Sequence, residues 1–210
     1  MVDDSSRLYR TKVMEPGTWP NTTAASPEVP TKSQLLVEAW VDGSDPRCGL
    51  VIEGGTAPAR EGLGIEILRQ VKAQPGDPSE GFVWSEYDFA DNYRMLRSLE
   101  DFAKKDRDVD TWNLYVDYER KFYRLLSRPL LFVQGLGENR TVYDTQREFL
   151  HHEIVRRVTQ AQYDEPRLTV LSTPRLAAYE SSHPSFYEYL REYCAVVRLD
   201  SSPGADRGEG

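Results

Sequence analysis

The stretch that decides the fold is LLFVQGLGENRTVYDTQREFLHHEIVRRVTQAQYDEPRLTVL, residues 130–171. It opens with a run that is apolar throughout, Leu130–Val133, of the kind that is buried on both faces of a parallel sheet. Helical periodicity follows over 141–161, and a second short apolar run occupies 167–171. A strand, a helix and a strand in this order form a βαβ unit, so we expect two parallel strands joined by a right-handed crossover.

The chain before this unit also alternates between helical and extended patterns. Strands are predicted over 34–41 and 49–53, which are rich in strand-forming residues and lie next to Asp-Gly and Asp-Pro turns. Residues 82–84 form either a short strand or a turn. Apolar residues at helical spacing predict three helices, over 57–73, 90–105 and 111–127.

The resulting fold prediction is an α/β domain over 34–199. We expect a mixed sheet with a C-terminal βαβ unit and helices packed on it; the long helical stretch from 90 to 127 leaves an α+β fold as the alternative. A last helix is predicted over 186–197, where Ser185 and Glu188 have the spacing of a capping box.

The two ends of the chain have a different composition from this domain. Residues 1–33 are rich in Pro, Ser and Thr and have no apolar periodicity, and 200–210 have the same character. Such segments cannot bury enough apolar surface to fold, so we expect a disordered arm and a disordered tail.

Composition and charge narrow the possible classes of function. The chain has 210 residues, 39% of them hydrophobic, and a net charge of −8. An acidic chain argues against generic binding to nucleic acid, which needs concentrated Lys and Arg. Cys48 and Cys194 form no zinc or redox motif, and we find neither a signal peptide nor an apolar run that would span a membrane. We therefore expect an intracellular protein, cytoplasmic or nuclear.

The loop between the first strand of the βαβ unit and its helix is the first candidate binding site. A loop in this position presents free N–H groups and the positive end of the helix dipole to an anion. Gly135 and Gly137 permit close approach of the backbone, Arg140 adds a charged contact, and Thr141 caps the helix. The spacing lacks the third glycine of a dinucleotide fingerprint and the Gly-Lys-Ser/Thr of a P-loop. The loop therefore indicates either a phosphate site or a tight turn without a ligand.

Three carboxylates form a second candidate site. Asp42 follows a predicted strand, Glu66 lies on the next helix, and Asp88 follows 82–84. Acidic residues in such positions can hold the paired divalent ions of a nuclease. The turn Asp42-Gly43-Ser44 resembles the turn that often carries the first catalytic aspartate in the ribonuclease H-like superfamily, which implies metal-dependent cleavage of phosphodiesters. Asp-Gly is equally a common hairpin signal.

Glu119 is a third candidate, because its helical position falls on the apolar face of the helix over 111–127. A carboxylate there needs a partner, or its pKa rises through desolvation. It is hydrogen-bonded by a core tyrosine, reaches solvent at the edge of the apolar face, or acts as a functional acid.

No motif in the chain is a strong catalytic signature. We therefore expect a binding or regulatory protein that acts through contacts with a protein partner. The alternatives are an enzyme that binds a phosphate-bearing ligand at Gly135–Thr141, and a nuclease that uses Asp42, Glu66 and Asp88. We predict no metal site, and the sequence specifies neither a cofactor nor an oligomeric state.

Overall fold

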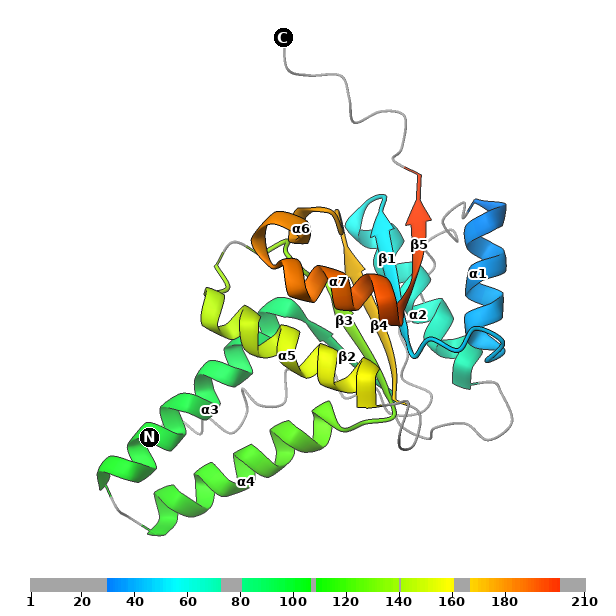
Figure 1. Ribbon diagram of the computed structural model, residues 1–210. Helices are drawn as coiled ribbons and strands as arrows, with labels where there is room; N and C mark the ends of the chain where they lie inside the picture. Colours follow the sequence, from blue (N-terminus) through cyan, green and yellow to red (C-terminus); the bar gives the residue numbers. More distant parts are fainter. Residues whose placement is uncertain (1–29, 73–80, 107–108, 140, 161–166, 201–210) are drawn as a thin grey trace.

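A computed structural model describes residues 30–72, 81–106, 109–139, 141–160 and 167–200. In these residues the chain forms an α/β sandwich, with a central sheet and helices on both of its faces (Figure 1).

The sheet has five strands in the order β2-β3-β4-β1-β5, and every pair of neighbours is parallel. The strands are β1 (Gly49–Gly54), β2 (Gly81–Ser85), β3 (Leu130–Gln134), β4 (Leu168–Thr173) and β5 (Cys194–Leu199). The predicted βαβ unit is confirmed: β3 pairs with β4 in parallel, with Leu130 opposite Leu168, and α5 (Asp144–Gln160) connects them.

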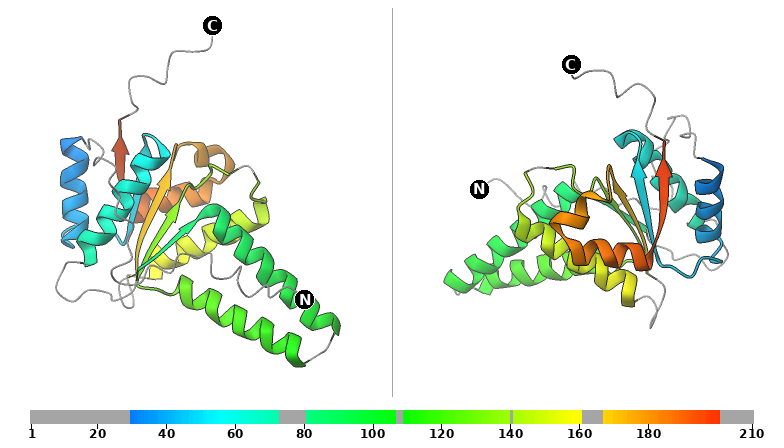
Figure 2. Two further views of the ribbon diagram at one scale, coloured as in Figure 1. Left: turned by 180° about the vertical axis from the view of Figure 1, so that it is seen from behind. Right: turned by 45° about the horizontal axis from the view of Figure 1, so that its top comes forward.

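Seven helices cover the sheet in the described part of the chain. The remaining six are α1 (Thr31–Val41), α2 (Ala57–Lys72), α3 (Glu86–Asp106), α4 (Val109–Leu126), α6 (Ala178–Ser182) and α7 (Pro184–Tyr193). Helices α1 and α2 pack on one face of the sheet, against side chains such as Leu50 and Phe132. The other five lie on the opposite face, against neighbours such as Val51 and Leu131 (Figure 2). Because successive side chains of a strand point to opposite faces, a strand covered on both sides is apolar throughout.

Two predictions about the N-terminal half are wrong. Residues 34–41 lie in helix α1 instead of forming a strand: Val37 and Trp40, one helical turn apart, are buried against the sheet, while Leu35 is 61% exposed. Consequently 49–53 has no antiparallel partner from that segment, and the sheet is parallel throughout instead of mixed. Residues 82–84, for which strand and turn were both open, belong to β2.

The predicted helix over 186–197 is also wrong at its C-terminal end. Helix α7 stops at Tyr193, and β5 begins at the next residue with Cys194, which is buried in the strand. The helix begins with Pro184 at its first position after His183, and no side-chain hydrogen bond caps it. Ser185 therefore lies inside the first turn, and the predicted capping box is absent from this helix.

The terminal segments lie mostly outside the described residues, so their disorder stays a prediction. Helix α1 begins at Thr31, inside the predicted arm 1–33. Among the described residues, no helix has both the length and the apolar character needed to cross a lipid bilayer.

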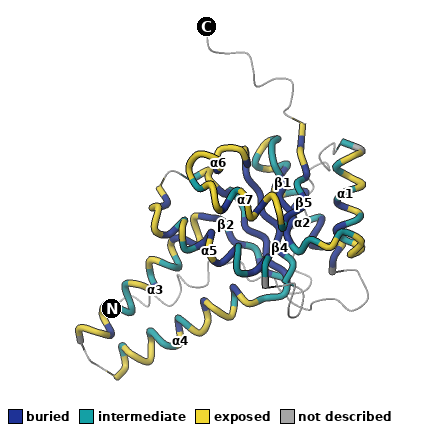
Figure 3. Tube along the Cα trace, in the orientation of Figure 1, coloured by how far each residue is buried: buried dark blue, intermediate teal, exposed yellow. Residues whose placement is uncertain are grey.

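Helices α3 and α4 run antiparallel and extend together well beyond the sheet, which Figures 1 and 2 show from different sides. We call them the α3–α4 arm. Its base is anchored in the core by Phe89, Tyr118 and Phe122. Towards the outer end, few of its residues are buried (Figure 3).

Candidate functional site

The turns at the carboxyl ends of β1, β3 and β4 are the natural place for a site in this sheet. Open α/β sheets bind ligands outside the carboxyl ends of their strands, where neighbouring strands lead the chain in opposite directions. That condition holds between β1 and β4: the chain leaves β1 for the far edge at β2, but it leaves β4 for the opposite edge at β5.

The turn after β1 is closed by an internal cation. Arg60, on the first turn of α2 and only 3% exposed, donates hydrogen bonds to the carbonyl oxygens of Gly54 (2.7 Å) and Gly55 (2.8 Å). The same guanidinium forms an ion pair with Glu138, which lies in the turn after β3. The two glycines have φ values of +83° and +58°, a left-handed conformation that glycine adopts without strain. The carbonyl oxygens of this turn and the carboxylate from the turn after β3 thus surround the side chain of Arg60.

Arg60 was not among the residues that the sequence pattern pointed to, although its spacing from Gly54 is that of the lysine in a P-loop. A P-loop places Gly, Lys and Ser/Thr at the fifth, sixth and seventh positions after its first glycine. Counted from Gly54, this chain has Ala59, Arg60 and Glu61 in those positions. None of these positions carries the residue that a P-loop requires, and the basic residue at the sixth position, Arg60, binds the turn itself.

A second buried ion pair organises the turn after β3. Glu86, the first residue of α3 and 1% exposed, accepts a hydrogen bond from the N–H of Gly137 (3.1 Å). Its other oxygen lies 3.0 Å from Nε of Arg147 on α5. Arg147 also donates to the carbonyl oxygen of Asn139 (3.1 Å). No pattern in the sequence pointed to Glu86, because its partners are far away along the chain.

The predicted phosphate loop uses several of its own N–H groups internally. The N–H of Gly135 bonds to the hydroxyl of Ser172 at 3.0 Å, that of Gly137 to Glu86, and that of Thr141 to the side chain of Asn139 at 2.9 Å. Arg140, the remaining residue of that prediction, lies outside the described residues. Phosphate binding by these backbone groups stays a prediction. It would require these N–H groups to break their present hydrogen bonds and donate to the phosphate instead.

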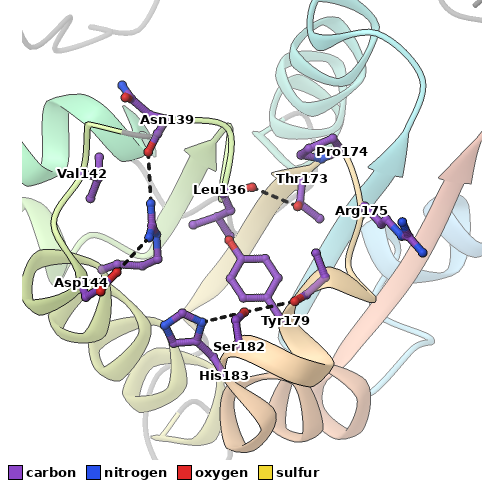
Figure 4. A pocket seen from close by; sticks show the side chains of 13 residues that line it. Leu136, Asn139, Val142, Asp144, Thr173, Pro174, Arg175, Tyr179, Ser182 and His183 are labelled. Carbon is purple, nitrogen blue, oxygen red and sulfur yellow. Dashed lines mark hydrogen bonds and ion pairs between the residues drawn. The ribbon is translucent and has the colours of Figure 1, made fainter. Parts of the chain in front are cut away.

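Beside this loop the surface contains a hollow of about 450 Å³, between the turns after β3 and β4, the start of α5, and α6 (Figure 4). Its polar lining comes from Asn139, Asp144, Arg147, Arg175 and His183, and its apolar lining from Leu136, Val142, Pro174, Ala178 and the ring of Tyr179. The volume lies within the range of pockets that bind small molecules.

One buried group that lines the hollow and one that lies behind its lining residues have no hydrogen-bond partner among the described residues. The hydroxyl of Tyr179 is one, and burial raises the pKa of this phenol. Nε2 of His151 is the other; its ring stacks on Phe186 at 3.8 Å. Burial lowers the pKa of His151 to about 3, and the nearby charges of His183 and Arg147 act in the same direction.

The three carboxylates of the nuclease prediction are spread over the fold. Asp42 follows helix α1 instead of a strand, so it lies near the amino end of β1, and hydrogen bonds from Ser44 lower its pKa. Asp88 lies past the carboxyl end of β2, at the other end and edge of the sheet, and Glu66 lies on α2. Catalytic metals in a pair are only about 4 Å apart. No cluster of three or more His, Cys, Asp or Glu in the described residues has the geometry to hold a metal ion, and the geometry gives the nuclease prediction no support.

Glu119 is accounted for by a neighbour on its own helix. The hydroxyl of Tyr115 donates a hydrogen bond of 2.6 Å to Glu119 and the pKa of this tyrosine is raised to about 12, chiefly by that bond. Of the three roles considered for Glu119, the first comes nearest: a tyrosine donates to the carboxylate, but Tyr115 is only half-buried and is not a core tyrosine.

Comparison with protein families, with curated proteins and with solved structures finds no match to this chain.

Proposed function

We propose that this chain is a protein-binding module and that the outer part of the α3–α4 arm is its contact surface. The observation that carries the proposal is the poor burial of this part. Among the described residues from 99 to 116, only Ala103 is buried. Two helices that pack only on each other make a single layer, and such a layer needs a second one to bury its apolar side chains.

The exposed side of α4 supports the proposal. Val109, Trp112, Val116 and Tyr123 follow one another at steps of three, four and seven residues, so they lie on one side of the helix. We call them the α4 stripe. Val109 is 70% exposed, Trp112 47% and Tyr123 40%. An apolar stripe at this spacing is typical of a helix that packs against another helix, and aromatic residues are favoured in protein interfaces.

The partner that the charges favour is a second copy of this chain. Residues 97–126 contain seven acidic and seven basic residues, whereas the whole chain has a net charge of −8. Two arms can therefore approach each other without net repulsion, and each offers charges of both signs next to its stripe. Pairing of two arms about a twofold axis would give a four-helix arrangement with an apolar centre.

The test is the oligomeric state of the full chain, measured by sedimentation equilibrium. We expect the wild type to form dimers and Trp112→Glu to be monomeric, because a charge at the centre of the stripe would be buried on pairing. The matched control is Leu35→Glu, at an apolar residue on α1 that is 61% exposed, which should leave the dimer intact. A wild type that stays monomeric at every concentration, or a Trp112→Glu variant that still dimerises, contradicts the proposal.

A further inference from the structure

The hollow between the turns after β3 and β4 carries an inference that does not depend on the arm. We propose that it binds a small organic anion, with a carboxylate or a phosphate group attached to a compact apolar body. It lies outside the carboxyl ends of β3 and β4, next to the position between β4 and β1 where open α/β sheets hold ligands, and its volume of about 450 Å³ suits a molecule of that size.

Arg147 supplies a pre-oriented cation. Its Nε is held by the buried carboxylate of Glu86 at 3.0 Å, and one terminal nitrogen is held by the carbonyl oxygen of Asn139 at 3.1 Å. The other terminal nitrogen has only a long contact of 3.4 Å with Asp144, whose side chain is 86% exposed. An exposed pair of this length contributes little, so the anionic oxygen of a ligand can take the place of Asp144.

Two further groups extend the site around this cation. Arg175 stands at the rim, on the opposite side from Asp144 in Figure 4, and its side chain makes no hydrogen bond or ion pair with the described residues. The imidazole of His183 also lines the hollow. The anion therefore meets the guanidinium of Arg147, with Arg175 as a second cation at the rim, while the carboxylate of Glu86 is already paired with Arg147.

Tyr179 supplies the second observation that points to a ligand. Its side chain is only 4% exposed, and its hydroxyl has no hydrogen-bond partner in the described residues. A buried hydroxyl without a partner costs free energy, which a ligand oxygen would recover. The hydroxyl is directed toward the turn at Leu136 (Figure 4), and a Cβ at Gly137 would lie 2.9 Å from it, so a side chain at that position would crowd this group. The ring of Tyr179 and its apolar neighbours suit the body of the ligand.

Isothermal titration calorimetry on the full chain tests the site with phenyl phosphate and with benzoate, and benzyl alcohol serves as the neutral analogue. We expect at least one anion to bind and the alcohol not to bind. The anion with the lower Kd shows whether the site prefers a phosphate or a carboxylate group. Asp144→Asn should bind severalfold tighter, because it removes the internal competitor. Arg175→Ala and Tyr179→Phe should each bind about tenfold more weakly, since each loses a charged or buried hydrogen bond.

Matched variants separate these effects from damage to the fold. Arg120→Ala, an exposed arginine on α4, and Trp112→Glu on the α4 stripe should both bind like the wild type, so failure of the arm proposal would not affect this one. Tyr179→Phe should melt at the same temperature as the wild type or higher, because it removes an unpaired hydroxyl. The proposal is overturned if neither anion binds at millimolar concentration, if benzyl alcohol binds equally well, or if Asp144→Asn and Arg175→Ala leave the affinity unchanged.

Discussion

The carboxylate of Glu86 lies 3.0 Å from the guanidinium of Arg147, and together they join the first residue of α3 to the first turn of α5. The carboxylate is almost fully buried, whereas the arginine side chain is 15% exposed. The second oxygen of Glu86 holds the turn after β3 through the N–H of Gly137. One carboxylate thus connects three segments at the carboxyl end of the sheet.

Glu86→Gln should lower the free energy of unfolding by about 3 kcal/mol, because it leaves the charge of Arg147 largely buried without its partner. Urea denaturation measures the change. The control is Asp91→Asn, which breaks the exposed pair of Asp91 with Arg94 and should change stability by less than about 0.5 kcal/mol. If the two substitutions lowered the free energy of unfolding equally, burial of the Glu86–Arg147 pair would not increase its contribution to stability.

Two glycines of helix α2 should respond in opposite ways to alanine. A Cβ at Gly64 would lie 2.2 Å from the ring of Phe132, whereas a Cβ at Gly62 would have no neighbour within 4 Å. Gly64→Ala should therefore destabilise the protein by about 2 kcal/mol through overpacking, and Gly62→Ala should stabilise it by about 0.5–1 kcal/mol through helix propensity. Thermal unfolding of the two variants checks the sign of each change; a stabilising Gly64→Ala would contradict the packing of α2 on β3.

His151 should make the protein sensitive to mild acid. Its pKa is about 3 in the folded chain, against an ordinary value of 6.5, because the ring is buried and faces His183 and Arg147. Between these two values the unfolded chain binds a proton that the folded chain does not, so stability falls as the pH falls from 6.5 toward 3. The slope due to this residue is about 1.4 kcal/mol per pH unit.

Urea denaturation of wild type and His151→Phe between pH 7 and pH 4.5 isolates this contribution. Phenylalanine keeps a ring against Phe186 but cannot take up the proton, so the variant should lose less stability over the range. His152→Phe, on the exposed side of the same helix, should keep the wild-type dependence. Parallel curves for His151→Phe and the wild type would show that His151 is not the group responsible.

Arg157 is a buried cation whose role is to satisfy carbonyl groups at the amino end of the sheet. It is fully buried and donates to the carbonyl oxygen of Leu126 at the end of α4, to that of Leu168 at 3.3 Å, and to the hydroxyl of Thr169 at 3.1 Å. Arg157→Leu should cost about 3 kcal/mol, because two buried carbonyl groups lose their donor.

Arg157→Lys should be nearly as unstable as Arg157→Leu, since a single ammonium group cannot reproduce the planar arrangement of donors in the guanidinium. Arg124→Leu, at an exposed position on α4, is the control and should be close to neutral in the same denaturation measurement. A lysine variant as stable as the wild type would show that charge alone is sufficient at this position.

The fold could be predicted where local pattern and burial agree. The apolar runs of β3 and β4 and the helical spacing between them predict the parallel βαβ unit, because a strand, a helix and a strand in this order normally form one. The same reasoning failed for α1. Val37 and Trp40 are residue types that favour strands, but their burial against the sheet at helical spacing stabilises a helix instead. It failed again at β5, because α7 passes directly into the strand with no turn residue between Tyr193 and Cys194.

The candidate sites could be predicted only in part. Arg60 lies six residues after Gly54, the spacing of the P-loop lysine, but Ala59 and Glu61 do not match that motif, so this spacing alone is a weak signal. Glu86, Glu138 and Tyr179 are brought to the carboxyl end of the sheet by contacts between segments far apart in the chain, and no local pattern distinguishes them from ordinary helix or turn residues.

The position of β1 in the sheet determines when the chain can fold. Among the described strands it is the first to be synthesised, yet its two neighbours are β4 and β5, the last two of them: Gly49 pairs with Thr169 on one side and with Cys194 on the other. During translation β1 must wait, unpaired, until β4 and β5 have left the ribosome, which is the kind of long-range closure that slows folding. A chain truncated before Cys194 would expose one side of β1 as an open edge, and open edges promote aggregation.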